Sequence, residues 1–261
     1  MASNDFVSQL FSVQDRAIAL TGAGGFLVGE MARALGRAGA RVGVFDLSLE
    51  QAERVAGEIS DAGGQALAGT LDARSRESFE AALGAMEDRF GGVDGMVNGA
   101  GINAPTPFLE IPLDEWNDII AVQLTGTMLG CQVFGRAMLE RGRGSIMNIS
   151  SASSGPPLSK AFTYSAAKAA VANLTQNLAR EWATKGVRVN ALRPGFFPTD
   201  WSREHFITPE REAAILGHTP MARYGTPSEL VGAVIWLMSD ASSFVTGAEI
   251  AVDGGFTAMT I

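Results

Sequence analysis

Short apolar runs alternate with longer amphipathic segments along most of the chain. The apolar runs, each typical of a buried strand, cover residues 16–20, 41–45, 65–70, 93–97, 145–149, 187–192 and 248–252. Between them, apolar positions recur every three or four residues at 26–38, 48–61, 75–90, 114–138, 164–184 and 227–238, which predicts helices. Strands that alternate with helices of this length form a parallel sheet covered on both faces. We therefore expect an α/β fold with a seven-stranded parallel sheet.

Small and polar residues gather where these predicted strands end. They occupy 22–25, Asp46, Asp72, 98–101, Ser151 and the pair Pro194 and Gly195. The carboxyl ends of parallel strands share one edge of the sheet, and ligands of such sheets bind beyond that edge. The common location of these residues predicts a single ligand site there.

The first predicted strand, turn and helix have the features of a nucleotide-binding unit. Residues 21–25 read Thr-Gly-Ala-Gly-Gly, and the first predicted helix follows at once. Glycines let the backbone approach a pyrophosphate, and a helix N-terminus offers free N–H groups and a positive dipole end. Asp46 follows the second strand, where it can accept hydrogen bonds from an adenosine ribose and would repel a 2′-phosphate. We expect a single Rossmann-type, doubly wound domain over 1–261 that binds NAD in preference to NADP.

Tyr164 and Lys168 stand four residues apart in an alanine-rich segment that favours a helix. Residues at this spacing share a helix face, so the phenol and the ammonium can point into one cleft. A nearby positive charge lowers the pKa of a tyrosine from about 10 toward a useful range for proton transfer. Ser151, at the end of the fifth predicted strand, could hydrogen-bond a carbonyl or alcohol oxygen held against Tyr164. The spacing alone also suits an ordinary core helix, and only the rest of the chain favours the catalytic interpretation.

Composition and charge exclude several classes of function. The 261 residues are 46% hydrophobic and carry a net charge of −8, with no Lys/Arg cluster that could follow a phosphate backbone. The single cysteine, Cys131, allows no internal disulfide, and His205 and His218 lack further ligands for a metal site. The N-terminus lacks a basic, apolar leader, and no segment is long and apolar enough to cross a bilayer. We expect a cytoplasmic protein that binds neither nucleic acid, membrane nor metal.

Residues 196–225 interrupt the alternation with prolines and aromatic side chains. A connection of this length in a compact domain usually has a function. We expect it to form a lid over the cleft and to become ordered when cofactor and substrate are both bound.

Taken together, these motifs resemble the short-chain dehydrogenase/reductase family along essentially the whole chain. The residues that carry the resemblance are Thr21-Gly22, Asn98-Gly-Ala-Gly101, Ser151, Tyr164-x-x-x-Lys168, Pro194-Gly195 and Asp253-Gly-Gly255. The resemblance implies hydride transfer between an NAD-type cofactor and a carbonyl/alcohol pair. It also implies Tyr164 as general acid/base, Ser151 as the group that holds the substrate oxygen, and Lys168 as a ribose ligand that lowers the tyrosine pKa.

The same resemblance implies a set of cofactor-binding residues. These are Gly22, Gly25, Phe26, Leu27, Asp46, Leu47, Asp72, Ala73, Asn98, Gly99, Ala100, Tyr164, Lys168, Pro194, Gly195, Phe197 and Thr199. The chain departs from the family pattern in its glycine turn, where Phe26 and Val28 replace two glycines. Gln123 stands where many members have an asparagine that steadies a water near the lysine; it could replace that asparagine, or the proton relay could be altered.

A narrower resemblance concerns the sugar-acid and polyol members, the fructuronate reductase (mannonate oxidoreductase) and gluconate 5-dehydrogenase types. It rests on residues 21–29, 98–103, 194–197 and 218–225. A hydroxylated acid requires a cation, for which Arg203 is the first choice, with a solvated surface arginine as an equal alternative. Asn103, Ser153 and Trp201 are the expected polar or stacking walls.

Two other functions and one assembly remain open at this stage. A 3-oxoacyl thioester reductase is the enzyme alternative, although Asp46 disfavours the NADPH that reductive biosynthesis usually draws on. A non-catalytic dinucleotide-binding protein is the alternative of another class. The last helix and the apolar residues 256–261 predict exposed apolar surface, which a homotetramer, as in similar family members, would bury.

Overall fold

The computed structural model describes residues 3–260, in which seven parallel strands form one sheet. The strands are β1 (Ala17–Thr21), β2 (Arg41–Asp46), β3 (Gln65–Thr70), β4 (Gly95–Asn98), β5 (Gly144–Ile149), β6 (Val187–Pro194) and β7 (Glu249–Val252). Their order across the sheet is β3-β2-β1-β4-β5-β6-β7, and all neighbours are parallel. The expected α/β fold with a seven-stranded parallel sheet is confirmed.

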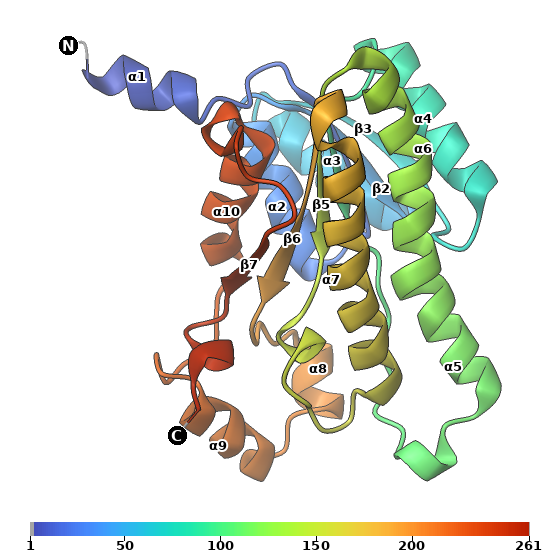
Figure 1. Ribbon diagram of the computed structural model, residues 1–261, viewed down its shortest axis with the longest axis vertical. Coiled ribbons are helices and arrows are strands. Elements are labelled where there is room, and N and C mark those ends of the chain that lie inside the picture. The colour runs from blue at the N-terminus through green and yellow to red at the C-terminus, as the bar shows by residue number, and fades with distance from the viewer. Residues whose placement is uncertain (1–2, 261) are drawn as a thin grey trace.

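Helices cover both faces of this sheet (Figure 1). They are α1 (Ser3–Leu10), α2 (Phe26–Arg37), α3 (Leu49–Asp61), α4 (Arg76–Phe90), α5 (Leu113–Ile120), α6 (Gly126–Arg141), α7 (Phe162–Trp182), α8 (Asp200–His205), α9 (Pro209–His218) and α10 (Val231–Met238). One apolar core joins α2, α3 and α10 to one face, and a second joins α4, α6 and α7 to the other. The chain order reverses between β1 and β4, which is where doubly wound sheets bind ligands.

Local chemistry explains where several helices begin and end. Ser48 caps α3 by accepting a hydrogen bond from the backbone N–H of Gln51, and Ser75 caps α4 in the same way. Gly91 and Gly142 end α4 and α6 in the left-handed conformation that glycine adopts without steric cost. These signals are local, so the predicted helix boundaries lie close to the observed ones.

Three features differ from the sequence-based expectation. The helix expected over 114–138 is divided by a π-helical turn over Ala121–Thr125, where the hydroxyl of Thr127 binds the carbonyl of Gln123 at 2.8 Å. The segment 196–225 contains α8 and α9, which begin at the hydroxyl caps Thr199 and Thr208. Helix α1 was not predicted, because its eight residues are too few for a clear periodic pattern.

The C-terminal segment is less exposed than its composition suggested. Phe256 is only 5% exposed, and its ring packs against the rings of Phe196 and His218. Apolar surface at this residue therefore gives no support to a tetramer, and the homotetramer stays a prediction from family likeness. Within residues 3–260, no helix has the length and apolar character that crossing a membrane requires.

A buried chain of amide hydrogen bonds joins the centre of the sheet to α7. The Asn98 side-chain amide donates to the Asn148 Oδ1 at 2.8 Å, and the Asn148 amide donates to the Thr175 Oγ1 at 2.9 Å. Thr175 in turn donates to the carbonyl of Val171, one turn earlier in α7. All three side chains are at most 4% exposed, so the network is a specific tie between β4, β5 and α7.

We expect Asn148→Ala to lower the free energy of unfolding by about 2–4 kcal/mol, because it removes the oxygen acceptor of the buried Asn98 amide and the donor to the buried Thr175 hydroxyl. Urea unfolding followed by circular dichroism measures this loss. Asn177→Ala is the matched control, since its amide hydrogen-bonds only to Asn173 on the exposed face of α7. Equal unfolding free energies for the two variants would contradict the assigned role of the network.

Candidate active site

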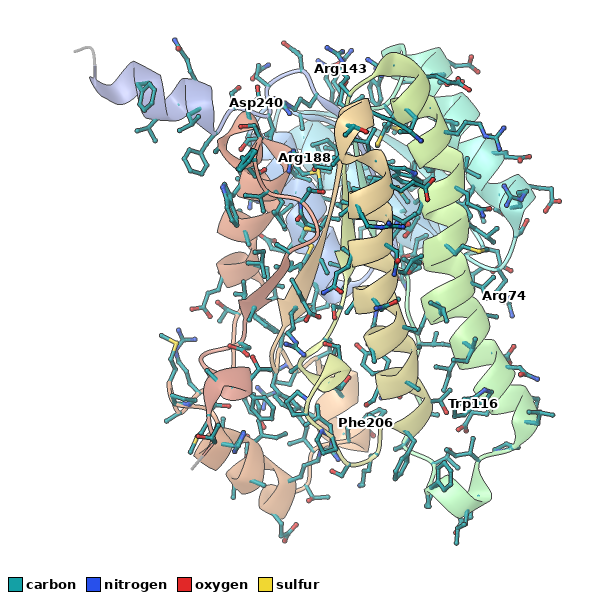
Figure 2. The ribbon with its side chains drawn as sticks, in the orientation of Figure 1. Arg74, Trp116, Arg143, Arg188, Phe206 and Asp240 are labelled. Atoms are coloured by element: carbon teal, nitrogen blue, oxygen red, sulfur yellow. The ribbon has the colours of Figure 1, made fainter. Side chains whose placement is uncertain are left out.

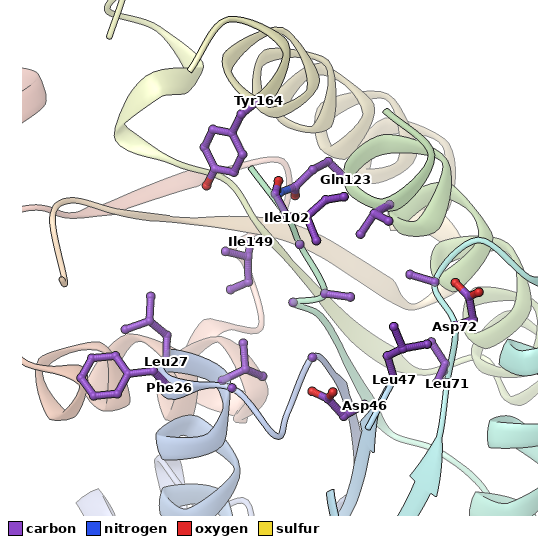
Figure 3. A pocket seen from close by; sticks show the side chains of 18 of the residues that line it. Phe26, Leu27, Asp46, Leu47, Leu71, Asp72, Ile102, Gln123, Ile149 and Tyr164 are labelled. Atoms are coloured by element: carbon purple, nitrogen blue, oxygen red, sulfur yellow. The ribbon is translucent and has the colours of Figure 1, made fainter. Parts of the chain in front are cut away.

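A cleft of about 570 Å³ lies at the carboxyl ends of the first four strands (Figure 3). Gly22 follows β1 with a φ of +67°, and a Cβ there would lie 2.8 Å from the Cα of Ala100, after β4. Only glycine allows these two turns to approach so closely. Helix α2 begins beside them, and its N-cap Gly25 has no side chain to satisfy the first N–H groups. Its free backbone donors and positive dipole end suit a pyrophosphate.

Asp46 lies at the opposite end of the cleft from Tyr164 (Figure 3). Its Oδ2 accepts a hydrogen bond from the backbone N–H of Gly24 at 3.0 Å, and its Oδ1 accepts one from Ser48 at 3.1 Å. These bonds fix the carboxylate, and each oxygen keeps a lone pair that a ribose hydroxyl can use.

Asp72 and Arg74 form a second charged group on the cleft wall. The Arg74 guanidinium binds both carboxylate oxygens, with Nη2 2.9 Å from Oδ2 and Nε 3.0 Å from Oδ1. This hydrogen bonding by Arg74 holds the pKa of the Asp72 carboxyl below its ordinary value. Arg74, labelled in Figure 2, lines the cleft but was not predicted to do so. Its position two residues after Asp72, at the end of β3, was the available signal.

Tyr164 and Lys168 project from one face of α7, as their spacing predicted. The Lys168 ammonium is buried, donates to the carbonyl of Ile149 at 2.6 Å and lies 5.5 Å from the centre of the Tyr164 ring. Burial lowers the pKa of Lys168 to about 7. Burial also raises the pKa of Tyr164 above its ordinary value, and the Ser151 hydroxyl opposes this effect.

The expectation that Lys168 lowers the tyrosine pKa stays a prediction. In the structure the dominant influence on the pKa of Tyr164 is loss of solvent, and the one group that lowers it is Ser151. The Lys168 ammonium is likewise stripped of water, and its hydrogen bond is directed to Ile149.

The hydroxyl of Ser151 is held by its neighbour Ser153. The Ser151 Oγ accepts hydrogen bonds from the backbone N–H of Ser153 at 3.2 Å and from its hydroxyl at 3.1 Å. Both of these bonds use Ser151 as an acceptor, so its own proton can be directed to Tyr164 or to a bound oxygen.

Gln123 lies in the π-helical turn and lines the cleft beside Ile102 (Figure 3). Its side chain is 2% exposed, and its Nε2 donates to the carbonyl of Ile102 at 2.7 Å. Among residues 3–260 its Oε1 has no hydrogen-bond partner. A buried acceptor without a partner costs free energy unless a bound group satisfies it, so Gln123 is suited to bind a donor in the cleft.

A second pocket of about 340 Å³ adjoins the cleft and shares Tyr164 and Thr199 with it. Its other lining residues are Asn103, Ser151, Ser153, Leu158, Lys160, Ala161, Gly195, Phe196, Phe197, Pro198, Ser202, Phe206, Ile207 and Arg211. Phe206, which ends α8, is labelled in Figure 2. Because Tyr164 lies where the two cavities meet, a group in the second pocket and a cofactor in the cleft can both reach it.

The predicted substrate residues divide between this pocket and the surface. Asn103 and Ser153 line it, and the Asn103 Oδ1 is buried without a partner in the described chain. Arg203 does not line it: its half-exposed guanidinium lies 4.0 Å from a carboxylate oxygen of Glu212 and over the ring of Tyr224. The alternative of a surface arginine was therefore correct for Arg203. Trp201 belongs to α8, but its side chain lies outside the described part of the chain.

Most of the predicted cofactor residues line the cleft, and the exceptions have clear causes. Of the predicted set, Asn98, Pro194, Gly195 and Phe197 do not line it. The Asn98 side chain points into the core network, Pro194 is buried in β6, and Gly195 and Phe197 face the second pocket. Sequence reasoning missed Val28, Met31, Leu71, Arg74, Gly101, Ile102, Val122 and Ile149 as lining residues. Most of these are apolar, which gave them no chemical signal.

The geometry also bears on metal binding. Among the described residues, no group of three or more His, Cys, Asp or Glu side chains is arranged to hold a metal ion. His218 packs its ring against Phe256, whereas the side chain of His205 is outside the described residues.

Comparison with known proteins agrees with this geometry. Residues 28–257 match the family model described as enoyl-(acyl carrier protein) reductase. The 5-keto-D-gluconate 5-reductase of Escherichia coli (strain K12) is 36% identical over 252 residues, which cover 95% of this chain and 98% of that protein.

Two solved structures extend the comparison to the fold. The gluconate 5-dehydrogenase from Burkholderia cenocepacia J2315, in complex with NADP and tartrate, has a TM-score of 0.93 and 33% identity over 97% of this chain and 100% of its own. A candidate D-mannonate oxidoreductase from Haemophilus influenza, with bound NAD, has a TM-score of 0.90 and 33% identity over 97% and 99%. With a family model along most of its length and relatives this similar along nearly all of it, the chain belongs to the short-chain dehydrogenase/reductase family of oxidoreductases.

Proposed function

We propose that this enzyme interconverts a secondary alcohol and a carbonyl on a sugar, polyol or sugar acid, with NAD as the hydride carrier. The observation that carries the proposal is the place of Tyr164, which lines both the dinucleotide cleft and the adjoining pocket. The relatives named above act, by their names, on keto-gluconate, gluconate and mannonate.

A bound dinucleotide supplies the hydride acceptor, and the residues of this chain position the alcohol and move its proton. Ser151 donates its free hydroxyl proton to the substrate oxygen, which holds that oxygen beside Tyr164. Tyr164, once its own phenolic proton has passed to Lys168, accepts the alcohol proton as general base; in the reverse direction the protonated phenol donates to the carbonyl oxygen. The half-buried position of the phenol limits competition from water.

Lys168 is suited to pass that proton onward. Burial brings the pKa of its ammonium to about 7, so it can gain and lose a proton near neutral pH. Its hydrogen bond to the Ile149 carbonyl holds the amine between β5 and the phenol-bearing face of α7. The unpaired Oε1 of Gln123, also on the cleft, is the acceptor available to a water in such a relay.

NAD is favoured over NADP by the single negative charge at the ribose end of the cleft. Asp46 is fixed there by Gly24 and Ser48, and the exposed neighbour Leu47 offers no cation to a 2′-phosphate. Arg74 is the nearby cation on the cleft wall, and its Nε and Nη2 are directed to Asp72. A dianionic phosphate beside Asp46 would meet like-charge repulsion.

A 3-oxoacyl thioester reductase remains the second candidate because the matching family model is described by an acyl carrier protein activity. The pocket beside Tyr164 has apolar walls that include Phe196 and Ile207, but it also carries hydroxyls, an amide and two cations, which a hydroxylated substrate can use and an alkyl chain cannot. Asp46 also opposes the NADPH that such a reductase would use.

We also propose that the segment 196–225 acts as a lid within one domain over 1–261. Phe196, Phe197, Ser202 and Phe206 from this segment line the pocket beside Tyr164, so its movement would open or close that pocket. Limited proteolysis should cleave this segment more slowly when NAD and D-gluconate are both present than when either is absent. Equal cleavage rates under all conditions would count against a lid.

We expect Tyr164→Phe to reduce turnover by about 10²- to 10⁴-fold, because it removes the proton acceptor and leaves the ring in place. Affinity for NAD, measured by fluorescence titration, should change little. The chain contains one other tyrosine, Tyr224, which lines neither pocket, and Tyr224→Phe is the matched control with turnover close to wild type. A Tyr164→Phe variant as active as this control would exclude the proposed mechanism.

We expect Asp46→Asn to raise the ratio of kcat/KM for NADP to that for NAD by about 10- to 100-fold, because it removes the charge that repels a 2′-phosphate. Steady-state kinetics with both cofactors measures the ratio. Glu50→Gln removes an acid from the first turn of α3 without touching the cleft and should leave the ratio unchanged. If the two variants behave alike, Asp46 does not select the cofactor.

A further inference from the structure

The described side chains that line the pocket beside Tyr164 carry positive charge, although the protein as a whole is acidic. The whole chain carries a net charge of −8. Among the side chains that the structure describes, Arg211 and Lys160 line this pocket and no Asp or Glu does. Such a local excess of positive charge in an acidic protein indicates an anionic ligand.

Arg211 is held in place by a bidentate contact with the loop that precedes α7. Its Nη1 donates to the Ser159 Oγ and its Nη2 to the Ser159 carbonyl, both at 2.8 Å. These neutral acceptors orient the guanidinium but leave its charge uncompensated. Burial lowers the pKa of Arg211 from its ordinary value, and none of the described carboxylates forms an ion pair with it. The cost of a partly desolvated, unpaired cation is recovered when an anion binds.

Two acids flank Arg211 in sequence, and both have other partners. The exposed Glu210 is hydrogen-bonded to Thr208. Glu212 is directed to Arg203 and Tyr224, on the outer side of α8 and α9. The two arginines of the segment 196–225 that lie near Glu212 therefore have different surroundings. Arg203 has its own carboxylate and aromatic partners at the surface, whereas Arg211 faces the pocket.

Lys160 provides a second cation on the same wall. It has a φ of +58°, a conformation uncommon for a residue with a side chain, and it is exposed at the mouth of the pocket. No carboxylate in residues 3–260 pairs with its ammonium. Its backbone adjoins Ser159, so the loop that orients Arg211 also carries Lys160.

We propose that Arg211, assisted by Lys160, forms an anion subsite that binds the carboxylate of a hydroxylated acid while Ser151 and Tyr164 hold the reacting hydroxyl. The subsite rests on the proposed function and narrows its substrate class from sugars and polyols to sugar acids. The planar guanidinium still has donors beyond the two that bind Ser159, which a carboxylate can accept. Asn103 and Ser153, on the same pocket, supply hydrogen bonds for the remaining hydroxyls.

The test compares D-gluconate with D-glucitol. The two compounds differ only at one end, where D-gluconate has a carboxylate and D-glucitol has a hydroxymethyl group. We expect wild-type enzyme with NAD to favour the acid, and Arg211→Gln to lower the ratio of acid to polyol kcat/KM by about 10- to 100-fold. Arg211→Lys should lie between the two, because it keeps the charge and loses the planar fork. Lys160→Gln should lower the ratio less, since its ammonium is exposed.

Arg203→Gln is the matched control, because it removes an arginine of the same segment that does not line the pocket. It should leave the ratio unchanged. A purely structural role for Arg211 predicts instead that Arg211→Gln reduces activity on the acid and the polyol equally. That outcome, or an equal effect of the two arginine variants, would overturn the subsite.

Binding measured without turnover separates the subsite from the proposed function. Enzyme saturated with NADH should bind D-gluconate by calorimetry, and Arg211→Gln should weaken this binding by the same factor as the kinetic ratio. If no sugar, polyol or acid is oxidised but D-gluconate binds through Arg211, the proposed function fails and the subsite stands. If polyols are oxidised and D-gluconate does not bind, or binds equally to the variant, the subsite fails alone.

Discussion

The side-chain amide of Asn148 holds the two halves of the active site in register. It accepts a hydrogen bond from Asn98, at the end of β4, and donates one to Thr175, in α7. The turn that forms the floor of the dinucleotide cleft begins just after Asn98, and α7 carries Tyr164. Because these bonds lie in a dry interior, they have few alternative arrangements. The distance between the turn below the cofactor and the Tyr164 phenol is therefore set by hydrogen bonds that contact neither cofactor nor substrate.

The features that could be predicted from sequence are those set by neighbouring residues. Strand positions follow from apolar runs. The turn at Gly22 follows from the residue type, because glycine adopts the left-handed φ of +67° observed there without steric cost. Tyr164 and Lys168 share a helix face because of their spacing alone. Asp46 reaches the cleft because the end of a parallel strand is always at the ligand edge. Each of these needs only local geometry and one rule of topology.

The features that escaped prediction depend on which way a side chain turns in the packed fold. Arg203 and Arg211 lie in one irregular segment, and the caps at Thr199 and Thr208 decide the faces that α8 and α9 present. Asn98 belongs to a strand, so its side chain enters the core although its neighbours border the cleft. A motif identifies the residue type and position but not this rotation, which nonlocal contacts determine.

Selection of an anion by an acidic protein depends on distance and burial more than on total charge. At physiological salt the screening length is about 8 Å, so carboxylates on remote surfaces contribute little at the pocket. Arg211 is half-buried and lies inside the pocket wall, where solvent and salt screen its charge less. The overall negative charge slows the association of an anion with the protein, whereas the cations in the pocket wall determine how tightly the bound anion is held. An uncompensated guanidinium oriented by neutral acceptors is consequently better suited to reversible carboxylate binding than one already paired, as Arg203 is with Glu212.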